Sequence, residues 1–309
     1  MIFSRKAIGV EIVPAGLRMV LLADGRASTQ LEAWGEASFP ADTVRNSLRE
    51  PNVLQAAAFV QTLRETHLKL GTGLSRVSVS LPDATGRVII HDLETRYRNK
   101  QEGIDVLRWK LKKIVPFDIN EAHLDFQELR QKDTGEMSVL VSLVTRQVVT
   151  QYEELFLLAG LEPTRIDFTS FNQYRLFADR LQVAENYALA SWDGGMVSLL
   201  IFFGGILEFY RAKEIPGNDF DANRIYREIN SSLLVHQDKN PGHTLEELYF
   251  CAPVEAAETF QAILAEVTGL QPVPLEVERA LALKGGVRIE RRTLQSLAPS
   301  LGAALRNLP

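Results

Sequence analysis

The feature that most constrains the fold is a strand-turn-strand plan that occurs in both halves of the chain. The first copy reads AIGVEIVPAGLRMVLLADGR (residues 7–26), and the second reads YALASWDGGMVSLLIFFGGILEFYR (residues 187–211). Each copy has an apolar strand, a turn that follows an acid, a second strand and a glycine-containing tight turn. Glu11 and Asp193 take the same place in this plan, at the end of the first strand. The chain is therefore interpreted as an internal duplication.

Two such three-stranded units, each followed by helices, predict a two-lobed α/β protein of the ribonuclease-H-like or actin-like kind with duplicated βββαβα subdomains. We expect residues 1–185 to form the first lobe and residues 186–309 the second. A small α/β subdomain is expected as an insertion at residues 83–163. In such a fold the two acid-bearing turns would face one another across a cleft.

Helical and strand patterns agree with this alternation. A helix is predicted from about residue 53 to 70, closed by Gly71 and followed by the strand RVSVSL. In the insertion, a helix would place Ile104, Leu107, Leu111 and Ile114 on one face. The segment from Ile215 onward is expected to give a loop and then a helix, and Pro299 should mark where the last helix begins or bends.

Composition excludes several classes of protein. With 46% hydrophobic and 24% charged residues, the chain can bury one large or two medium cores. A formal net charge of −5 gives no reason to bind nucleic acid, and the basic run from Arg108 to Lys113 is interpreted as a solvated helix face. The lone Cys251 excludes an internal disulfide, and the five histidines show no spacing typical of a metal site.

No membrane insertion is expected. The most apolar run, residues 194–207, is shorter than the about 20 residues that span a bilayer, and it is interpreted as a buried hairpin. The amino terminus lacks the apolar core of a secretion signal, so a reducing cytoplasm is the expected location.

The order of these segments resembles the PilM-type cytoplasmic proteins of type IV pilus assembly, which are actin-like relatives of the cell-division protein FtsA. Five stretches carry the resemblance, and they cover nearly the whole chain: IGVEIVPAGLRMVLL, LRWKLKKIVPFDINEAHLDFQEL, YEELFLLAGLEPTRIDF, ASWDGGMVSLLIFFGGILEFYR and LAPSLGAALR. The first and fourth resemble the two phosphate loops of the family, and the second resembles its inserted subdomain.

The resemblance implies a nucleotide cleft between the lobes, with ATP or ADP held by backbone N–H groups and with Mg²⁺ held through water by carboxylates. The candidate cofactor-binding residues are Glu11, Val13, Asp193, Gly194, Gly195 and Ala252, and the candidate metal-binding residues are Glu11 and Asp193. No catalytic residue is assigned.

Several of these positions depart from the family pattern. Where the family reads Asp-Ile-Gly-Ser, this chain has Glu11, Ile12, Val13 and Pro14. Val13 places a branched side chain where phosphate approaches the backbone, and Pro14 removes an N–H donor. Ala252 and a following proline replace the Gly-Gly of the adenosine loop, whereas Asp193 and Gly195 keep the Asp-x-Gly pattern. Nucleotide binding is therefore expected to be weak or absent, without turnover.

Alternatives remain for the acids and for the whole chain. Glu11 could instead face solvent or pair with a neighbouring cation, and Asp193-Gly194-Gly195 could be an ordinary hairpin turn. An active actin-like ATPase, a small-molecule kinase of the same superfamily and the cytoplasmic part of an L-type secretion protein are the competing interpretations.

The resemblance also implies a partner. In the family, the groove between the first lobe and the inserted subdomain takes the short cytoplasmic tail of a single-span inner-membrane protein, which would be PilN-like. Val115 to Phe117 is the candidate edge of this groove, although for Phe117 a core position at a helix end is the favoured interpretation. The protein would then lie peripherally at the inner membrane. Self-association is left open.

Overall fold

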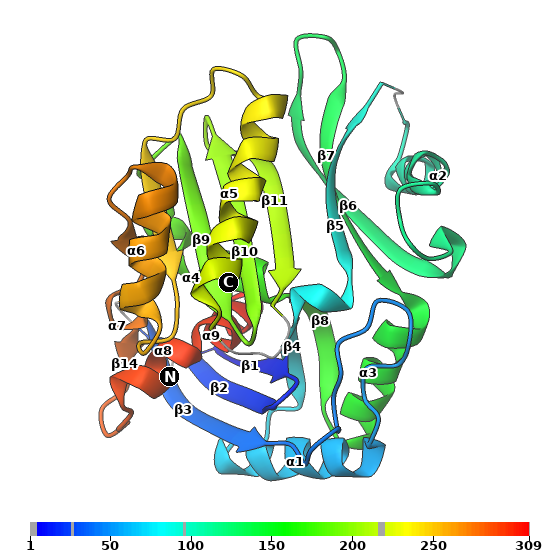
Figure 1. Ribbon diagram of the computed structural model, residues 1–309. Coiled ribbons are helices and arrows are strands. Elements are labelled where there is room, and N and C mark those ends of the chain that lie inside the picture. The colour runs from blue at the N-terminus through cyan, green and yellow to red at the C-terminus, as the bar shows by residue number, and fades with distance from the viewer. Residues whose placement is uncertain (1–4, 26–27, 95–96, 216–219, 309) are drawn as a thin grey trace.

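Two β-sheets with the same strand order form the frame of the molecule (Figure 1). The computed structural model describes residues 5–25, 28–94, 97–215 and 220–308. The first sheet has the order β14-β3-β2-β1-β4-β8, and the second has the order β11-β10-β9-β12-β13. In both, an antiparallel three-stranded meander is followed by two strands that run parallel to its first strand. The predicted duplication and the two-lobed α/β fold class are confirmed.

The first sheet consists of β1 (Lys6–Val13), β2 (Gly16–Asp24), β3 (Thr29–Ser38), β4 (Arg76–Leu81), β8 (Glu162–Phe168) and the short β14 (Ala282–Leu283). The second sheet consists of β9 (Tyr187–Asp193), β10 (Met196–Phe203), β11 (Ile206–Glu214), β12 (Glu247–Cys251) and β13 (Val273–Pro274). The central strands β1 and β9 are buried along nearly their whole length, because helices cover both faces of each sheet.

Helices form three layers around the two sheets. The outer face of the first sheet is covered by α1 (Ala56–Lys69) and α3 (Arg146–Leu158), and that of the second by α5 (Ala222–Lys239) and α6 (Ala257–Thr268). Between the sheets lie α4 (Thr169–Leu181), α7 (Val277–Ala280), α8 (Arg291–Ser296) and α9 (Ala298–Leu305). Leu22 of β2, Phe177 of α4 and Leu200 of β10 share this middle core, so one hydrophobic core joins the two lobes.

The inserted subdomain has a sheet and a core of its own. The sheet has the order β5-β7-β6 and consists of β5 (Arg87–Leu93), β6 (Ala122–Gln131) and β7 (Met137–Thr145), and α2 (Lys100–Leu111) packs against it. All of these elements fall within the predicted insertion, and Figure 1 shows the sheet rising beside β11.

One detail of the predicted α2 is wrong. Leu107 and Leu111 are buried and Ile104 packs against the same core, as expected. Ile114 lies beyond the end of the helix and its side chain is 57% exposed. The helix ends at Leu111, three residues before Ile114, so Ile114 does not share its face.

The last part of the chain returns to the first lobe. β14 pairs with β3, and α9 packs across β1 and α4. A Cβ atom at Gly302 would lie 1.8 Å from the backbone oxygen of Asn172, and one at Gly9 would lie 1.9 Å from that of Ser300. Only glycine allows backbones to approach so closely. The division into lobes at residue 186 stays a prediction. β14 and α9 follow residue 186 in the chain but pack against the first sheet.

The remaining sequence signals agree with the elements observed. Gly71 has a φ of 60° beyond α1, and Pro299 lies in the first turn of α9. The apolar run of residues 194–207 forms β10 and the turn into β11, as predicted. The loop expected before α5 includes residues 216–219, which lie outside the described residues. Within the described part of the chain, no helix combines the length and apolar character needed to cross a membrane.

Candidate functional site

The turns that follow β1 and β9 contact one another at the junction of the two lobes. Pro14 and Ala15 form the first turn, and Gly194 and Gly195 form the second. The Cγ1 atom of Val13 lies 3.4 Å from the point that a Cβ atom on Gly194 would occupy. The structure therefore brings together the two turns that the sequence singled out.

The two acids do not occupy equivalent positions in their hairpins, which corrects the sequence-based alignment. Asp193 faces Met196 in the pair that closes its turn, whereas Glu11 faces Arg18, two residues farther from the turn. Gly194 and Gly195 have φ values of 56° and 81°, the mirror-image turn that matches strand twist. Proline cannot adopt positive φ, so the first hairpin is closed by a different turn. Glu11 consequently lies deeper in its sheet.

Arg18 links the two acids. Its guanidinium donates a hydrogen bond of 2.9 Å to Glu11 Oε2 and lies 3.7 Å from Asp193 Oδ1. Gln173 of α4 also donates from Nε2 to Asp193 Oδ2, at 3.2 Å. The Glu11 side chain is 0% exposed, and its second oxygen has no hydrogen-bond partner. The pairing of Glu11 with a neighbouring cation, one of the two alternatives for this residue, is thus present.

Burial controls the protonation of this cluster. Burial raises the pKa of Glu11 to about 8; the positive charge of Arg18 opposes this shift and the negative charge of Asp193 adds to it. Burial also raises the pKa of Asp193, against the opposing influence of Arg18. The buried carboxyl group of Glu11 and the partly exposed one of Asp193 thus share one cation.

The residues present do not fit a nucleotide-bound Mg²⁺ between Glu11 and Asp193. A metal held through water needs carboxylate oxygens that solvent can reach, but Glu11 is buried and Arg18 already supplies the positive charge. Val13 lies against one side of Gly194, close to where a phosphate would have to approach the turn, and Pro14 offers no N–H donor.

Ala252, the predicted adenosine-loop residue, lies at the same sheet edge but inside a core. It follows β12, whose Cys251 pairs with Ser191 of β9. The side chain is buried in the second-lobe core that also contains Trp192 and Phe260. The side chain of Ala252 is therefore not available to contact an adenine ring.

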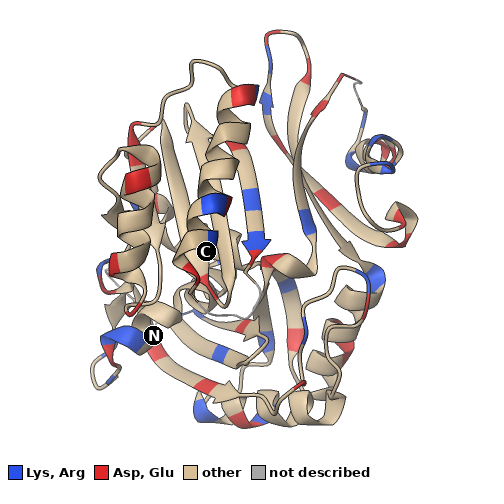
Figure 2. Ribbon diagram, viewed as in Figure 1, with Lys and Arg blue, Asp and Glu red and all other residues tan. Residues whose placement is uncertain are grey.

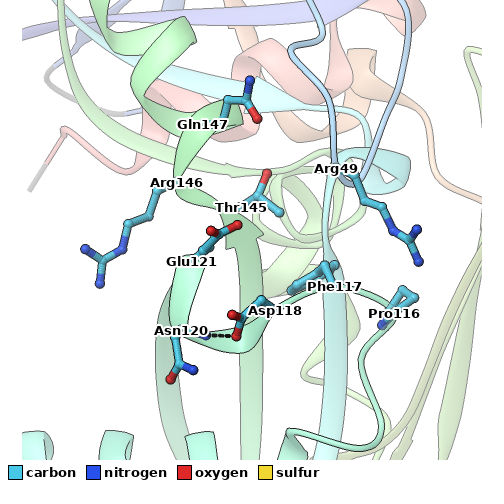
Figure 3. A pocket seen from close by; sticks show the side chains of 9 residues that line it. All are labelled: Arg49, Pro116, Phe117, Asp118, Asn120, Glu121, Thr145, Arg146 and Gln147. Atoms are coloured by element: carbon cyan, nitrogen blue, oxygen red, sulfur yellow. Dashed lines mark hydrogen bonds between the residues drawn. The ribbon is translucent and has the colours of Figure 1, made fainter.

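A separate cavity of about 650 Å³ lies where the inserted subdomain meets the first lobe (Figure 3). Its walls come from the loop before α1, from the segment between α2 and β6, and from the junction of β7 with α3. The lining residues are Arg49, Pro116, Phe117, Asp118, Asn120, Glu121, Thr145, Arg146 and Gln147. Of the predicted groove edge, Phe117 lines the cavity while also packing on the core of the insertion, and Val115 is buried in that core.

The cavity combines an apolar wall with polar groups of both charges. Arg49 and Arg146 are basic, and Asp118 and Glu121 are acidic. The Thr145 hydroxyl is buried and has no hydrogen-bond partner. This hydroxyl is not exposed to the cavity, so the exposed side chains of Arg146 and Gln147 beside it are the polar groups that can bond to a ligand.

Sequence reasoning assigned no role to Arg18. The pairing of Arg18 with Glu11 could have been predicted from the turn. A two-residue turn closed by Val13 and Gly16 fixes the register of the hairpin and places residue 18 opposite Glu11.

Comparisons with known proteins give the family. The family model described as type IV pilus assembly protein PilM matches residues 9–193. A chain of a PilM–PilN type IV pilus biogenesis complex is similar over 98% of both chains, with 22% identity and a TM-score of 0.78. No curated protein matches.

Two further solved structures share the fold at lower similarity. A Bacteroides thetaiotaomicron protein with an actin-like ATPase fold has 14% identity, covers 89% of this chain and 92% of its own, and gives a TM-score of 0.56. The cytoplasmic domain of EpsL, from the type II secretion system of Vibrio cholerae, has 12% identity, covers 95% and 94%, and gives 0.53. The family match spans more than half of the chain, which therefore belongs to the PilM family of type IV pilus assembly proteins.

Proposed function

We propose that this protein is an actin-like scaffold of a type IV pilus assembly machine that binds the short cytoplasmic tail of a PilN-like inner-membrane protein. The observation that carries the proposal is the cavity between the inserted subdomain and the first lobe, at the place where a tail was expected from the sequence. A structural neighbour that is itself a PilM–PilN complex supports this partner.

The chemistry of the cavity suits a peptide. Phe117 can contact an apolar side chain, and the exposed amide of Gln147 can bond to a backbone group of an extended segment. Arg49 and Arg146 face a ligand together with Asp118 and Glu121, so a mixed-charge peptide is favoured over a polyanion.

Calorimetric titration with a peptide copied from the tail of the membrane protein encoded next to this one tests the proposal. We expect a Kd on the order of 10 μM. Gln147→Leu keeps the approximate size of the side chain and removes the exposed amide, so it should weaken binding about three- to tenfold. Trp109→Ala is the matched control, because Trp109 is exposed on the same subdomain and does not line the cavity. An unresponsive titration of the full chain, or equal effects of both variants, contradicts the proposed tail site.

Nucleotide turnover is not part of the proposed function, and nucleotide binding is expected to be weak or absent. This expectation is supported by the position of Arg18 between the two carboxylates and by the contact of Val13 with Gly194. Calorimetry with Mg-ATP, with Asp193→Ala as the control, tests it. Sub-micromolar affinity with steady phosphate release would instead favour an active ATPase or a small-molecule kinase.

Binding to a membrane-anchored tail would hold the protein peripherally at the cytoplasmic side of the inner membrane. Self-association and the lack of nucleic-acid binding stay predictions. In the view of Figure 2, acidic and basic residues are interspersed along both lobes, which agrees with the small net charge.

A further inference from the structure

A cluster of two histidines and one glutamate lies on the second lobe, near the start of β11 and away from Glu214 at the other end of that strand. Glu208 comes from β11, His236 from α5 and His243 from the segment after α5. His243 Nδ1 is 2.8 Å from Glu208 Oε2, and His236 Nε2 is 3.8 Å from the same oxygen. One ligand atom from each of the three residues lies within 4.8 Å of the other two.

His236 is the least expected member of this cluster. The residue is 2% exposed, and its Nε2 atom has no hydrogen-bond partner. A buried polar atom without a partner costs free energy unless a ligand completes its bonding.

Neighbouring groups hold the other two side chains in place. The ring of His243 stacks on Phe203 with centroids 3.7 Å apart. Glu208 is nearly buried, and its Oε1 atom accepts a hydrogen bond of 2.5 Å from Arg130 of β6 in the inserted subdomain. The Oε2 atom is thereby left facing the two histidines. Support of this kind from a second layer of residues is typical of metal ligands.

We propose that Glu208, His236 and His243 bind one divalent transition-metal ion of the Zn²⁺ class. With bonds of about 2.0–2.1 Å in a tetrahedral site, ligand atoms lie roughly 3.3 Å apart. The separations of 2.8 and 3.8 Å from Glu208 Oε2 bracket that value, so small side-chain movements would complete the site. Two imidazoles and one carboxylate suit Zn²⁺, whereas Mg²⁺ and Ca²⁺ prefer oxygen ligands.

A fourth position would be left for water or an external ligand. Glu208 lines a cavity of about 520 Å³ between the inserted subdomain and the second lobe, together with Arg130 and Lys239. Solvent can therefore reach the site. Because Arg130 offsets the charge of Glu208, the two neutral imidazoles would provide most of the affinity. The metal would join β11, α5 and the segment after α5.

Titration of the metal-free, tag-free full chain tests the inference. We expect Co²⁺ to bind as one ion per chain with the visible absorption of a tetrahedral site, and Zn²⁺ to displace it. Two conservative variants keep the surroundings intact: His243→Phe retains the ring that stacks on Phe203, and Glu208→Gln can still accept a hydrogen bond from Arg130. Each should raise the Kd for Zn²⁺ at least about tenfold.

His123→Ala is the matched control, because His123 is exposed on β6 and is not part of the cluster. This variant should bind Zn²⁺ like the parent chain. Lack of one-to-one binding, or binding that His243→Phe and Glu208→Gln leave unchanged, overturns the inference and makes the cluster a hydrogen-bonded group only. A far-ultraviolet circular dichroism spectrum of each variant identifies any loss of fold.

Discussion

Arg18 determines whether the acids beside the two turns can bind an external cation. In an actin-like cleft of the kind the resemblance implied, carboxylates would face a metal and phosphates. Here Arg18 is bonded to Glu11 and close to Asp193, so an internal cation neutralises the acids that would otherwise attract an external one. Arg18 therefore forms a structural link between Glu11 of the first lobe and Asp193 of the second.

The protonation of Glu11 predicts a pH dependence of stability. The folded pKa is about 8 and the ordinary value is 4.5, so between these pH values the folded protein keeps a proton that the unfolded chain releases. This contribution to stability is fully present below pH 4.5 and is lost as the pH rises to about 8. Glu11→Gln cannot titrate, and the slope of its unfolding free energy should be flatter, by at most about 1.4 kcal/mol per pH unit.

Urea denaturation at several pH values measures both slopes. Asp193, whose pKa is also raised, remains in both proteins, so the difference between the slopes reports on Glu11. Parallel curves for the parent and the variant would contradict the assigned protonation.

Removal of Arg18 should destabilise the protein. Arg18→Met leaves the buried Glu11 and the partly exposed Asp193 without a cation, and we expect the free energy of unfolding to fall by about 3 kcal/mol at pH 8. The loss should be smaller at pH 5, where Glu11 is neutral. Arg45→Met is the control, since the pair of Arg45 with Glu50 is exposed and should contribute within about 0.5 kcal/mol. Equal midpoints of denaturation for Arg18→Met and Arg45→Met would contradict a stabilising role of Arg18 between the two acids.

At the scale of elements, local patterns predicted most of the structure. Helix and strand positions followed from apolar periodicity, and glycines such as Gly71 ended helices where expected. Ile114 was misassigned because the apolar periodicity continues beyond Leu111, where α2 ends. Glu11 and Asp193 were aligned one to one because both precede turns, whereas the register of each hairpin depends on which residues close its turn.

The contact between α9 and α4 gives a prediction at this scale. Gly302→Ala would place a Cβ atom 1.8 Å from the backbone oxygen of Asn172, so the helices must separate. We expect thermal unfolding to show a loss of about 1–3 kcal/mol. Gly73→Ala is the control, because nothing lies within 4 Å of a Cβ atom there. A stability of Gly302→Ala at the level of the control would contradict the close packing.

At the scale of the whole molecule, a buried hydrogen-bonded group joins all three parts of the fold. Asp83 lies where the inserted subdomain leaves the first lobe, and its Oδ1 atom accepts hydrogen bonds of 2.5 Å from Ser170 Oγ of α4 and 2.6 Å from the Tyr210 hydroxyl of β11. The ring of Tyr210 also stacks on Phe171, with centroids 5.1 Å apart. These contacts limit the rotation of the second lobe against the root of the insertion.

Loss of the Tyr210 hydroxyl tests this link. Tyr210→Phe keeps the ring and leaves the buried Asp83 with one donor side chain fewer, so the unfolding free energy should fall by about 1–3 kcal/mol. Tyr152→Phe is the control, because the buried hydroxyl of Tyr152 has no hydrogen-bond partner. That variant should be neutral or slightly stabilised. A loss of similar size in both variants would assign the effect to ring packing.

Contacts between distant parts of the chain were the least predictable from sequence. His236 and His243 lack the spacing of a known motif, and their meeting with Glu208 depends on how α5 packs against β11. The place of Gln147 in the cavity wall likewise depends on where the insertion sits. The fold class could be predicted from the sequence because each copy of the duplicated strand plan is a continuous segment within one half of the chain.

The return of α9 to the first lobe has a consequence for synthesis. A ribosome makes β1 long before α9, yet the face of β1 at Gly9 is covered by Ser300 and its helix. The nascent first lobe therefore keeps an apolar strand face uncovered until α9 has been made. Because the second-lobe strands and helices lie between β1 and α9 in the chain, the first lobe is completed only after the second lobe has been synthesised.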